Sequence, residues 1–264
     1  MTVAHCGSVS ALSLGLPASC AIPEAKGTLP KQMFTARTPV SAKLKQRFAN
    51  DIESVTMLAL LRPNTIGVAA APEGKGPAEV MVIGIQHRGA NAPVEVIEHI
   101  AGMRRSGIVF VCVSDEVPAE AQESQPQGSQ SRSDSGEREA KSTTSHDESC
   151  AFAVRRAMPG KAGRPRANRI FVSDYQPSGK AALAIDGATL DEVWESLNAQ
   201  VILGSTDAHD LDVRIANRDN LVSLRADEAK LAKDHARAKQ PAQRNELYAK
   251  LHKLRAEISR LEAE

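Results

Sequence analysis

The chain has 264 residues, with 33 lysines and arginines against 32 aspartates and glutamates, so its formal net charge is +1. This balance excludes attraction of the whole molecule to nucleic acid or to an anionic membrane, and any such binding must come from a local patch. Aromatic residues make up only 3% of the chain, so stacking on nucleic-acid bases cannot be a major binding mode. The hydrophobic content of 42% is enough for a core of Ala, Val, Leu and Ile.

The cysteines and hydrophobic runs limit the class of protein. Four cysteines, Cys6, Cys20, Cys112 and Cys150, lie far apart without a C-x-x-C pair, so the sequence predicts neither a structural zinc site nor another bound cofactor. Cys112 lies in an apolar run over 108–113, where its thiol would act as a small buried hydrophobe. The chain has no run of about twenty apolar residues, the length that a membrane helix needs. We therefore expect a soluble, cytoplasmic protein that does not enter a membrane.

Residues 1–28 are rich in Ala, Gly, Ser and Pro without sustained periodicity. This composition predicts a flexible N-terminal arm, or an extended arm laid over the domain. From Val40, the apolar residues Leu44, Phe48 and Ile52 recur every four positions among lysines and an arginine. That spacing predicts an amphipathic helix whose buried stripe covers a sheet.

The next part of the chain alternates between apolar runs and turns. Strands are predicted over 55–61, 65–71 and 79–86. A helix is expected over 93–105, entered at Pro93. The wholly apolar run over 108–113 is typical of a central strand that is covered on both faces. The order strand, helix, strand favours a mixed sheet.

Residues 115–149 are dominated by Ser, Gln, Glu, Gly and Arg with almost no large apolar residues, so we predict a disordered insertion there. Beyond it, two returning strands are predicted over 150–157 and 169–174, and a helix over 189–203 that contains Trp194, the only tryptophan. The predicted fold class is therefore α/β (α+β), in which a mixed β-sheet covered by helices spans residues 29–204.

Residues 205–264 are predicted to form a long helical hairpin or a coiled coil. A helical stretch runs from 211 to about 239, and Pro241 interrupts it because proline starts a helix more readily than it continues one. Two helices that meet at Gln240 and Pro241 can form either an antiparallel hairpin or a kinked rod. Beyond Pro241, five apolar residues at alternating spacings of four and three make the seam of a helix that packs lengthwise on another: Leu247, Leu251, Leu254, Ile258 and Leu261. We predict that this seam, here called the leucine seam, binds a partner surface either within the chain or on another protein.

The strongest local charge feature is a cationic run with no acidic residue between Cys150 and Val172. Such a patch can neutralise phosphates and release counterions, so we predict that it binds nucleic acid; the alternative is a solvated strand edge protected from aggregation. Within it, the segment 163–166 resembles the centre of an AT-hook, although Ala162 stands where a further arginine would be expected. The six cations of this basic run are Arg155, Arg156, Lys161, Arg164, Arg166 and Arg169.

No catalytic or cofactor motif stands out. Glu95 and His99 are four residues apart on one predicted helical face, which suits a metal pair or an acid–base pair but equally a solvated face. A restriction-type nuclease needs a carboxylate and a lysine on a strand. Glu79 opens a suitable strand, but Met81 stands two residues on and no acid-x-lysine pattern follows. We therefore predict no catalytic residue and no metal ligand.

Short features follow one another along the chain in a recognisable order. They are Leu16-Pro17, Lys31, Phe34, Leu44-Lys45, Phe48, Asp51-Ile52, Asn64-Thr65-Ile66, Glu79-Val80, the run from Ile108 to Phe110, and the segment Gln243 to Leu247 that leads into the leucine seam. Their order resembles one family, the bacterial domain-of-unknown-function family numbered 4391. The resemblance covers about residues 13–264, apart from the insertion.

Members of that family are encoded in bacteria and archaea, often beside superfamily-two helicases and DNA methyltransferases in what look like restriction or phage-defence operons. The resemblance implies antiviral defence as a setting, but no reaction and no catalytic residue. We expect a non-catalytic accessory or adaptor subunit whose hairpin binds a helicase or DNA methyltransferase and whose basic run touches DNA or RNA. Two alternatives stay open: a divergent metal-dependent nuclease with Glu79, Glu95, Glu98 or Asp51 as ligands, and a self-associating homodimeric scaffold.

Overall fold

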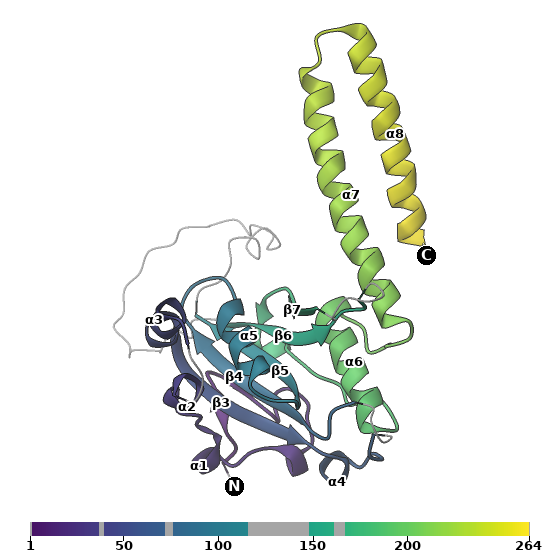
Figure 1. The fold of residues 1–264 in the computed structure, drawn as a ribbon. Coiled ribbons are helices and arrows are strands. Elements are labelled where there is room, and N and C mark those ends of the chain that lie inside the picture. Colours follow the sequence, from purple (N-terminus) through teal and green to yellow (C-terminus); the bar gives the residue numbers. More distant parts are fainter. Residues whose placement is uncertain (1, 37–39, 72–75, 116–147, 161–166, 264) are drawn as a thin grey trace, which may run out of the picture. The chain divides into compact units, whose positions relative to one another are not determined.

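The computed structural model describes residues 2–36, 40–71, 76–115, 148–160 and 167–263 (Figure 1). The chain divides into two compact units, Met1–Ala208 and His209–Glu264. The first is a mixed sheet covered by helices and the second consists of two long helices, so the predicted fold class is confirmed. Of the predicted insertion at 115–149, residues 116–147 lie outside the described residues.

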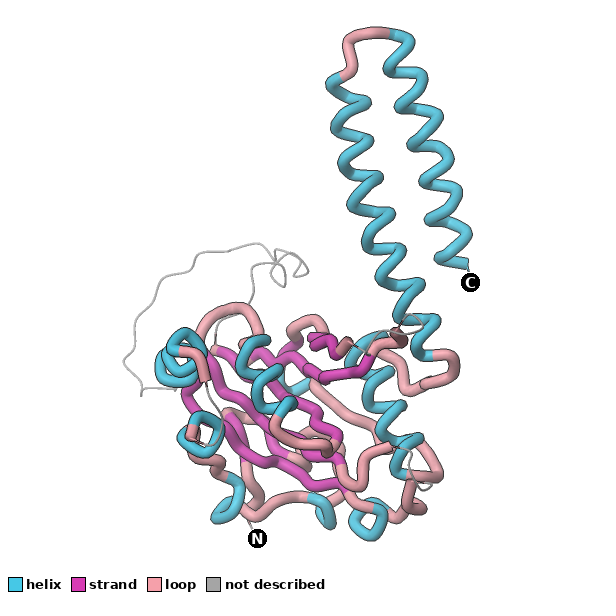
Figure 2. The backbone as a smooth tube through the Cα atoms, viewed as in Figure 1, coloured by secondary structure: helices cyan, strands magenta, loops and turns pink. Residues whose placement is uncertain are grey.

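The first unit is built on a six-stranded sheet, drawn in magenta in Figure 2. Its strands are β3 (Ile52–Leu61), β4 (Val80–His87), β5 (Gly107–Ser114), β6 (Ser149–Ala157), β7 (Asn168–Val172) and β8 (Gln176–Pro177), the last followed by the short helix η3 (Ser178–Lys180). Strands β3 to β7 lie side by side in chain order, and β8 pairs with β6. Strands β4 and β5 are parallel, and the other neighbouring pairs are antiparallel. A parallel pair needs a crossover connection, and helix α5 (Val94–Gly102) supplies it.

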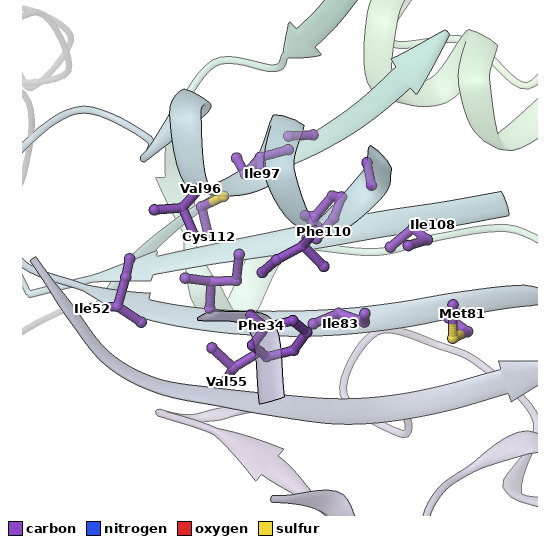
Figure 3. Close-up of a cluster of buried hydrophobic side chains, with 14 of the residues drawn as sticks. Phe34, Ile52, Val55, Met81, Ile83, Val96, Ile97, Ile108, Phe110 and Cys112 are labelled. Atoms are coloured by element: carbon purple, nitrogen blue, oxygen red, sulfur yellow. The ribbon is translucent and has the colours of Figure 1, made fainter. Parts of the chain in front are cut away.

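One face of the sheet, here called the α5 face, is covered by α5 and by α3 (Ala42–Asn50). Phe48 of α3, Ile97 of α5 and Phe110 of β5 belong to one hydrophobic cluster, and each is at most 2% exposed. Figure 3 shows Ile97 above Phe110 in this cluster. Burying a side chain such as Phe110 stabilises the fold by about 1.5–3 kcal/mol, so the cluster holds these elements together. Helix α3 ends at Asn50, and Ile52 opens β3 instead of extending the helix as predicted.

Helix α6 (Leu190–Leu203) covers the opposite face. Its first turn is a capping box, in which the Glu192 amide donates to Thr189 Oγ1 and the Thr189 amide donates to the Glu192 carboxylate. It ends at Gly204, whose φ of 69° is the left-handed conformation that glycine adopts without strain. Trp194 lies so close to Gly107 of β5 that a Cβ at Gly107 would stand 2.9 Å from the indole ring. The absence of a side chain at 107 therefore lets α6 approach the sheet.

The N-terminal residues are packed over the sheet, which is the second of the two arrangements predicted for them, an arm laid over the domain. They contain β1 (His5–Cys6), β2 (Val9–Ser10), η1 (Ala18–Cys20) and α1 (Glu24–Gly27), and α2 (Gln32–Thr35) follows. Cys6, Leu14 and Leu16 are at most 3% exposed, and the Ile22 amide donates to the Leu58 carbonyl of β3 at 3.0 Å. These apolar residues follow no helix or strand period, so periodicity did not reveal that they are buried.

Residues 65–71 do not form the strand predicted for them. The short helix α4 (Pro63–Ile66) follows β3, and proline suits its first position because its fixed φ matches a helix and its missing N–H is not needed there. The Thr65 hydroxyl accepts a hydrogen bond from the Arg62 amide at 2.8 Å. Ala69 then forms an isolated bridge with Thr189. The apolar residues of this segment therefore lie in a helical turn and a loop, and not in a strand.

The second unit is a hairpin of α7 (Leu211–Arg237) and α8 (Pro241–Ala263). Ala238 leaves the helical conformation with φ −66° and ψ 119°, so the chain reverses there and the two helices do not form a kinked rod. At 1.5 Å per residue, α7 and α8 are about 40 and 35 Å long. None of the helices in the described ranges is both long and apolar enough to cross a membrane.

Candidate interaction surfaces

The leucine seam lies on α8, in the hairpin that α8 forms with α7. Leu251 and Ile258 are buried, and the other three members, Leu247, Leu254 and Leu261, are half-buried. A helix in a two-helix hairpin has one neighbour, so the flank of its seam stays open to water. The seam therefore serves packing within the hairpin, and its binding to another protein stays a prediction.

Helix α7 carries a matching seam that the sequence analysis missed. Leu221, Leu224 and Leu231 are half-buried, and Glu228 and His235 occupy the intervening positions of the same three-and-four repeat. The three-and-four repeat is a sequence signal for these leucines, but two of its five positions hold the polar residues Glu228 and His235, which weakens the signal. The open flank of the hairpin is thus lined by leucines from both helices.

Ion pairs across the hairpin join residues that face each other in its antiparallel register. Arg255 Nε donates to Glu228 Oε1 at 2.6 Å, and Arg225 Nη2 donates to Glu262 Oε1 at 2.7 Å. Pairs as exposed as these contribute about 0–1 kcal/mol each. They favour one alignment of the two helices, while the buried apolar side chains supply most of the packing energy.

Exposed apolar side chains also gather on the hairpin. Of the six large hydrophobic residues that are exposed among those described, three lie on α7 and α8: Val213, Val222 and Tyr248. The Tyr248 ring lies 6.2 Å from the ring of His235 across the hairpin. Single exposed hydrophobic residues need no explanation, but Val222 and Tyr248 each follow a half-buried seam leucine and extend the apolar surface that a partner could cover.

The basic run differs in the structure from what the sequence suggests, because carboxylates from other elements reach it. Arg155 and Arg156 are neighbours on β6, so their side chains point to opposite faces of the sheet. On the α5 face, Arg155 Nε lies 3.0 Å from Glu98 Oε1. On the other face, Arg156 Nη1 lies 2.7 Å from Glu195 Oε2 of α6, and the Arg156 side chain is only 12% exposed. Both carboxylates are distant in sequence, so a survey of the run itself could not find them.

Of the four remaining cations of the run, the structure describes one, Arg169. The guanidinium carbon of Arg169 lies 4.6 Å from the centre of the Phe171 ring, a distance at which a cation is attracted to the ring face. Lys161, Arg164 and Arg166 lie outside the described residues, as does the segment that resembles an AT-hook. The structure therefore describes Arg155, Arg156 and Arg169. The first two pair with carboxylates, and the third lies against an aromatic ring.

The four carboxylates considered as nuclease ligands each lie beside a cation. The nitrogen–oxygen distances are 2.7 Å for Arg62–Glu79, 2.8 Å for Arg47–Glu95, 3.0 Å for Arg155–Glu98 and 3.8 Å for Arg47–Asp51. A hydrogen bond from Lys43 at 3.0 Å, helped by the charge of Arg47, holds the pKa of the Glu95 carboxyl below its usual value. Within the described ranges, no three His, Cys, Asp or Glu side chains are grouped so that they could hold a metal ion.

Glu95 and His99 share a face of α5 but turn to different partners. Glu95 is paired with Lys43 and Arg47, whereas His99 Nε2 lies 2.6 Å from the carbonyl oxygen of Phe34. An Nε2 that donates its proton to this carbonyl has no lone pair for a metal or for proton abstraction, which leaves only Nδ1 of His99 for such a role. The structure therefore does not bring this pair together as a site.

A buried polar pair was not found from the sequence. Tyr175 Oη lies 2.9 Å from Nε2 of His87, which is 3% exposed at the end of β4. Burial raises the pKa of the Tyr175 phenol well above its usual value, so the hydroxyl keeps its proton. Cys112 is fully buried, and burial raises the pKa of its thiol, which agrees with its predicted role as a small hydrophobe. These groups are structural parts of the sheet.

The chain matches the model of a known family. A family model described as "Domain of unknown function (DUF4391)" matches residues 14–258. No curated protein and no solved structure matches the chain. The match spans both units and most of the chain.

Proposed function

We propose that this chain, which belongs to the DUF4391 family, is a non-catalytic accessory or adaptor subunit of a bacterial DNA-processing system in phage defence. Its hairpin docks on a larger protein, a helicase or DNA methyltransferase subunit, and its basic run contacts nucleic acid. Both activities take place in the cytoplasm. The setting and the partner class follow from the family resemblance, and the docking surface follows from the hairpin.

The observation that carries the proposal is the open flank of the hairpin. Six leucines along it are half-buried: Leu221, Leu224 and Leu231 on α7, and Leu247, Leu254 and Leu261 on α8. Two helices cannot enclose a core on their own, and helix pairs of this kind commonly pack against one or two further helices. Completing the burial of each half-buried leucine adds about 1 kcal/mol, roughly half the value for full burial. A partner that offers an apolar helix therefore gains several kcal/mol along this flank.

The charge pattern supports a binding role more than a catalytic one. Glu79, Glu95 and Glu98 each have a lysine or arginine within 3.0 Å, so their charge is already compensated by the fold. Replacing such a pairing by a metal ion would leave a cation without its partner. No arrangement of the described residues specifically favours the nuclease alternative.

The nucleic-acid contact depends on part of the basic run. Glu98 and Glu195 already neutralise Arg155 and Arg156, so these two arginines have less free charge to offer a phosphate. The contact therefore rests mainly on Lys161, Arg164 and Arg166, which are outside the described residues. Binding of this kind weakens steeply with salt because it releases counterions.

The docking is tested on the full-length protein in its native host. The tagged protein is isolated after nuclease treatment of the lysate, and its companions are identified by mass spectrometry. We expect a stoichiometric helicase or DNA methyltransferase subunit. Val222→Asp with Tyr248→Asp should remove it, because both side chains are more than 60% exposed and a charge there opposes an apolar interface.

The matched control places the same two charges one residue further along each helix. Ser223→Asp with Ala249→Asp changes exposed residues that are turned about 100° away around the helix axis, and the companion should be retained. Circular dichroism checks that both variants keep their helices. Recovery of the protein alone, or loss of the companion from both variants, would contradict the proposal, and a solution mass of two chains would favour the homodimeric scaffold.

The nucleic-acid contact is tested separately by measuring DNA and RNA affinity against salt concentration. Arg164→Gln with Arg166→Gln should weaken binding and lower the slope of the salt dependence by about two, one for each phosphate contact removed. Arg155→Gln with Arg156→Gln should change that slope less, because their carboxylate partners compete with phosphate. Equal effects of the two pairs would contradict this assignment.

A further inference from the structure

Two short helices leave part of the α5 face uncovered. Helix α5 has nine residues and α2 has four, so they are about 14 and 6 Å long. Strands β4 and β5 have eight residues each and span about 26 Å. A pocket of about 480 Å³ remains between these helices, with the sheet as its floor. Figure 3 shows part of that floor, where Met81 and Ile83 of β4 lie beside Ile108 of β5.

The lining of this pocket is apolar and adaptable. Nine of its ten lining residues are hydrophobic, and four of them are methionines, Met33, Met57, Met81 and Met103. Methionine is unbranched and polarisable, so it adjusts its shape to what it contacts. Such walls accept a flexible hydrocarbon more readily than a rigid or polar group.

One lining residue is charged. Arg104 follows the end of α5 and is exposed. No ion pair or hydrogen bond joins its side chain to any part of the chain that the structure describes. This differs from Arg155 and Arg156, whose charge is matched by carboxylates. A guanidinium that borders an apolar pocket without a partner is suited to a carboxylate on a ligand, which it can bind through two parallel hydrogen bonds.

The distribution of apolar surface favours a small molecule over a protein. A stable protein interface covers about 800 Å² on each side, so a docking site should extend over the rim of the pocket. Among the exposed large hydrophobic residues described, only Met33 belongs to this pocket. The apolar surface is therefore concentrated inside the hollow, and its volume is within the range of about 300–1,000 Å³ that is usual for small-molecule sites.

We infer that this hollow, here called the methionine pocket, binds a small amphipathic anion whose hydrocarbon chain lies among Met33, Met57, Met81 and Met103 and whose carboxylate pairs with Arg104. The inference is independent of the docking proposed for the hairpin, since it involves only the first unit.

The test uses the full-length protein with the methionine methyl groups labelled for nuclear magnetic resonance. Octanoate is the probe, and octanol is its uncharged counterpart. We expect saturable shifts of the four pocket methionines with both compounds. Met158, which lies outside the pocket, serves as an internal control and should not shift.

Charge recognition is tested with two neighbouring arginines that are both exposed. Arg104→Gln should weaken octanoate binding about two- to fivefold, the effect of removing one exposed ion pair, and leave octanol binding unchanged. Arg105→Gln, whose side chain does not line the pocket, should change neither. The inference is overturned if octanoate gives no saturable shift, if Met158 shifts as much as the pocket methionines, or if the two arginine variants behave alike. Protection of the pocket methionines only by a co-purified protein partner would also overturn it and assign the pocket to a protein interface.

Discussion

The contact between α6 and the sheet can be tested at Gly107, because this residue has no side chain to separate them. A Cβ at 107 would lie 2.9 Å from Cε3 of Trp194 and 3.1 Å from two further ring atoms, whereas ordinary contact begins near 3.4 Å. Neither side can yield easily. Gly107 is held in β5 by its pairing with Val80 of β4, and Trp194 is flanked on α6 by Val193 and Leu197, which are fully buried. The indole ring would have to recede by several tenths of an ångström together with its helix.

We therefore expect Gly107→Ala to lower the free energy of unfolding by about 1–3 kcal/mol, the usual cost of overpacking a core. Urea unfolding followed by circular dichroism measures this change. The fluorescence of Trp194, the only tryptophan, should change in the native state as well, because the ring moves relative to the strand.

Gly102→Ala is the matched control, since it adds the same methyl group where no atom beyond its chain neighbours and its own helix backbone lies within 4 Å. Gly102 is the last residue of α5, and alanine there should raise the free energy of unfolding by about 0.4–1 kcal/mol by restricting the unfolded chain. Opposite signs for the two substitutions would support the packing of α6 on β5. A Gly107→Ala protein with unchanged stability and unchanged fluorescence would refute it.

Three further predictions concern the first unit. Tyr175→Phe removes the hydroxyl bonded to His87 and should lower the free energy of unfolding by about 1 kcal/mol; urea titration measures this, and an unchanged midpoint would argue against the bond. Burial raises the pKa of the Cys6 thiol from 9.0 to about 12, so the folded state keeps a proton that the unfolded chain loses, and stability should fall as the pH rises from 9 towards 12. Cys6→Ala should make that fall smaller in unfolding curves recorded over this pH range, and an identical fall would exclude a contribution from this thiol. The Glu95 carboxyl should titrate below its usual pKa in a carbon-detected nuclear magnetic resonance experiment, and this pKa should rise in Lys43→Gln. Because the pKa is lowered in the folded state, the favourable contribution of this carboxylate to stability is present at neutral pH and is lost as the pH falls through the folded-state pKa.

Several elements could be predicted because their signals are carried by residues close together in the chain. The apolar run at 108–113 became β5, and Thr189 with Glu192 formed the cap that begins α6. Pro241 opens α8, in agreement with the rule that proline begins a helix more readily than it continues one. In each case the deciding interaction spans a few residues, so a sequence pattern can record it.

Other elements could not be predicted from local pattern. Ile52 continues the four-residue spacing of α3 but opens β3, because pairing with β4 prevailed over helical periodicity. The N-terminal arm is buried by the sheet it crosses, whereas its composition left both a flexible arm and an arm laid over the domain open. Local propensity is a weak constraint when tertiary contacts compete with it.

The sequence by itself determined strands β3 to β7, helices α5 and α6, the hairpin and the leucine seam, because these depend on spacings of two to seven residues. Only the tertiary structure decided which charges are compensated and where a pocket remains. Glu98 and Glu195 reach the basic run from helices on opposite faces of the sheet, and the methionine pocket is lined from α2, β3, β4, β5 and the end of α5. These ion pairs and this pocket arise from contacts between residues far apart in the chain. The order of the strands in the sheet determines which of those residues meet, and no local sequence pattern encodes that order.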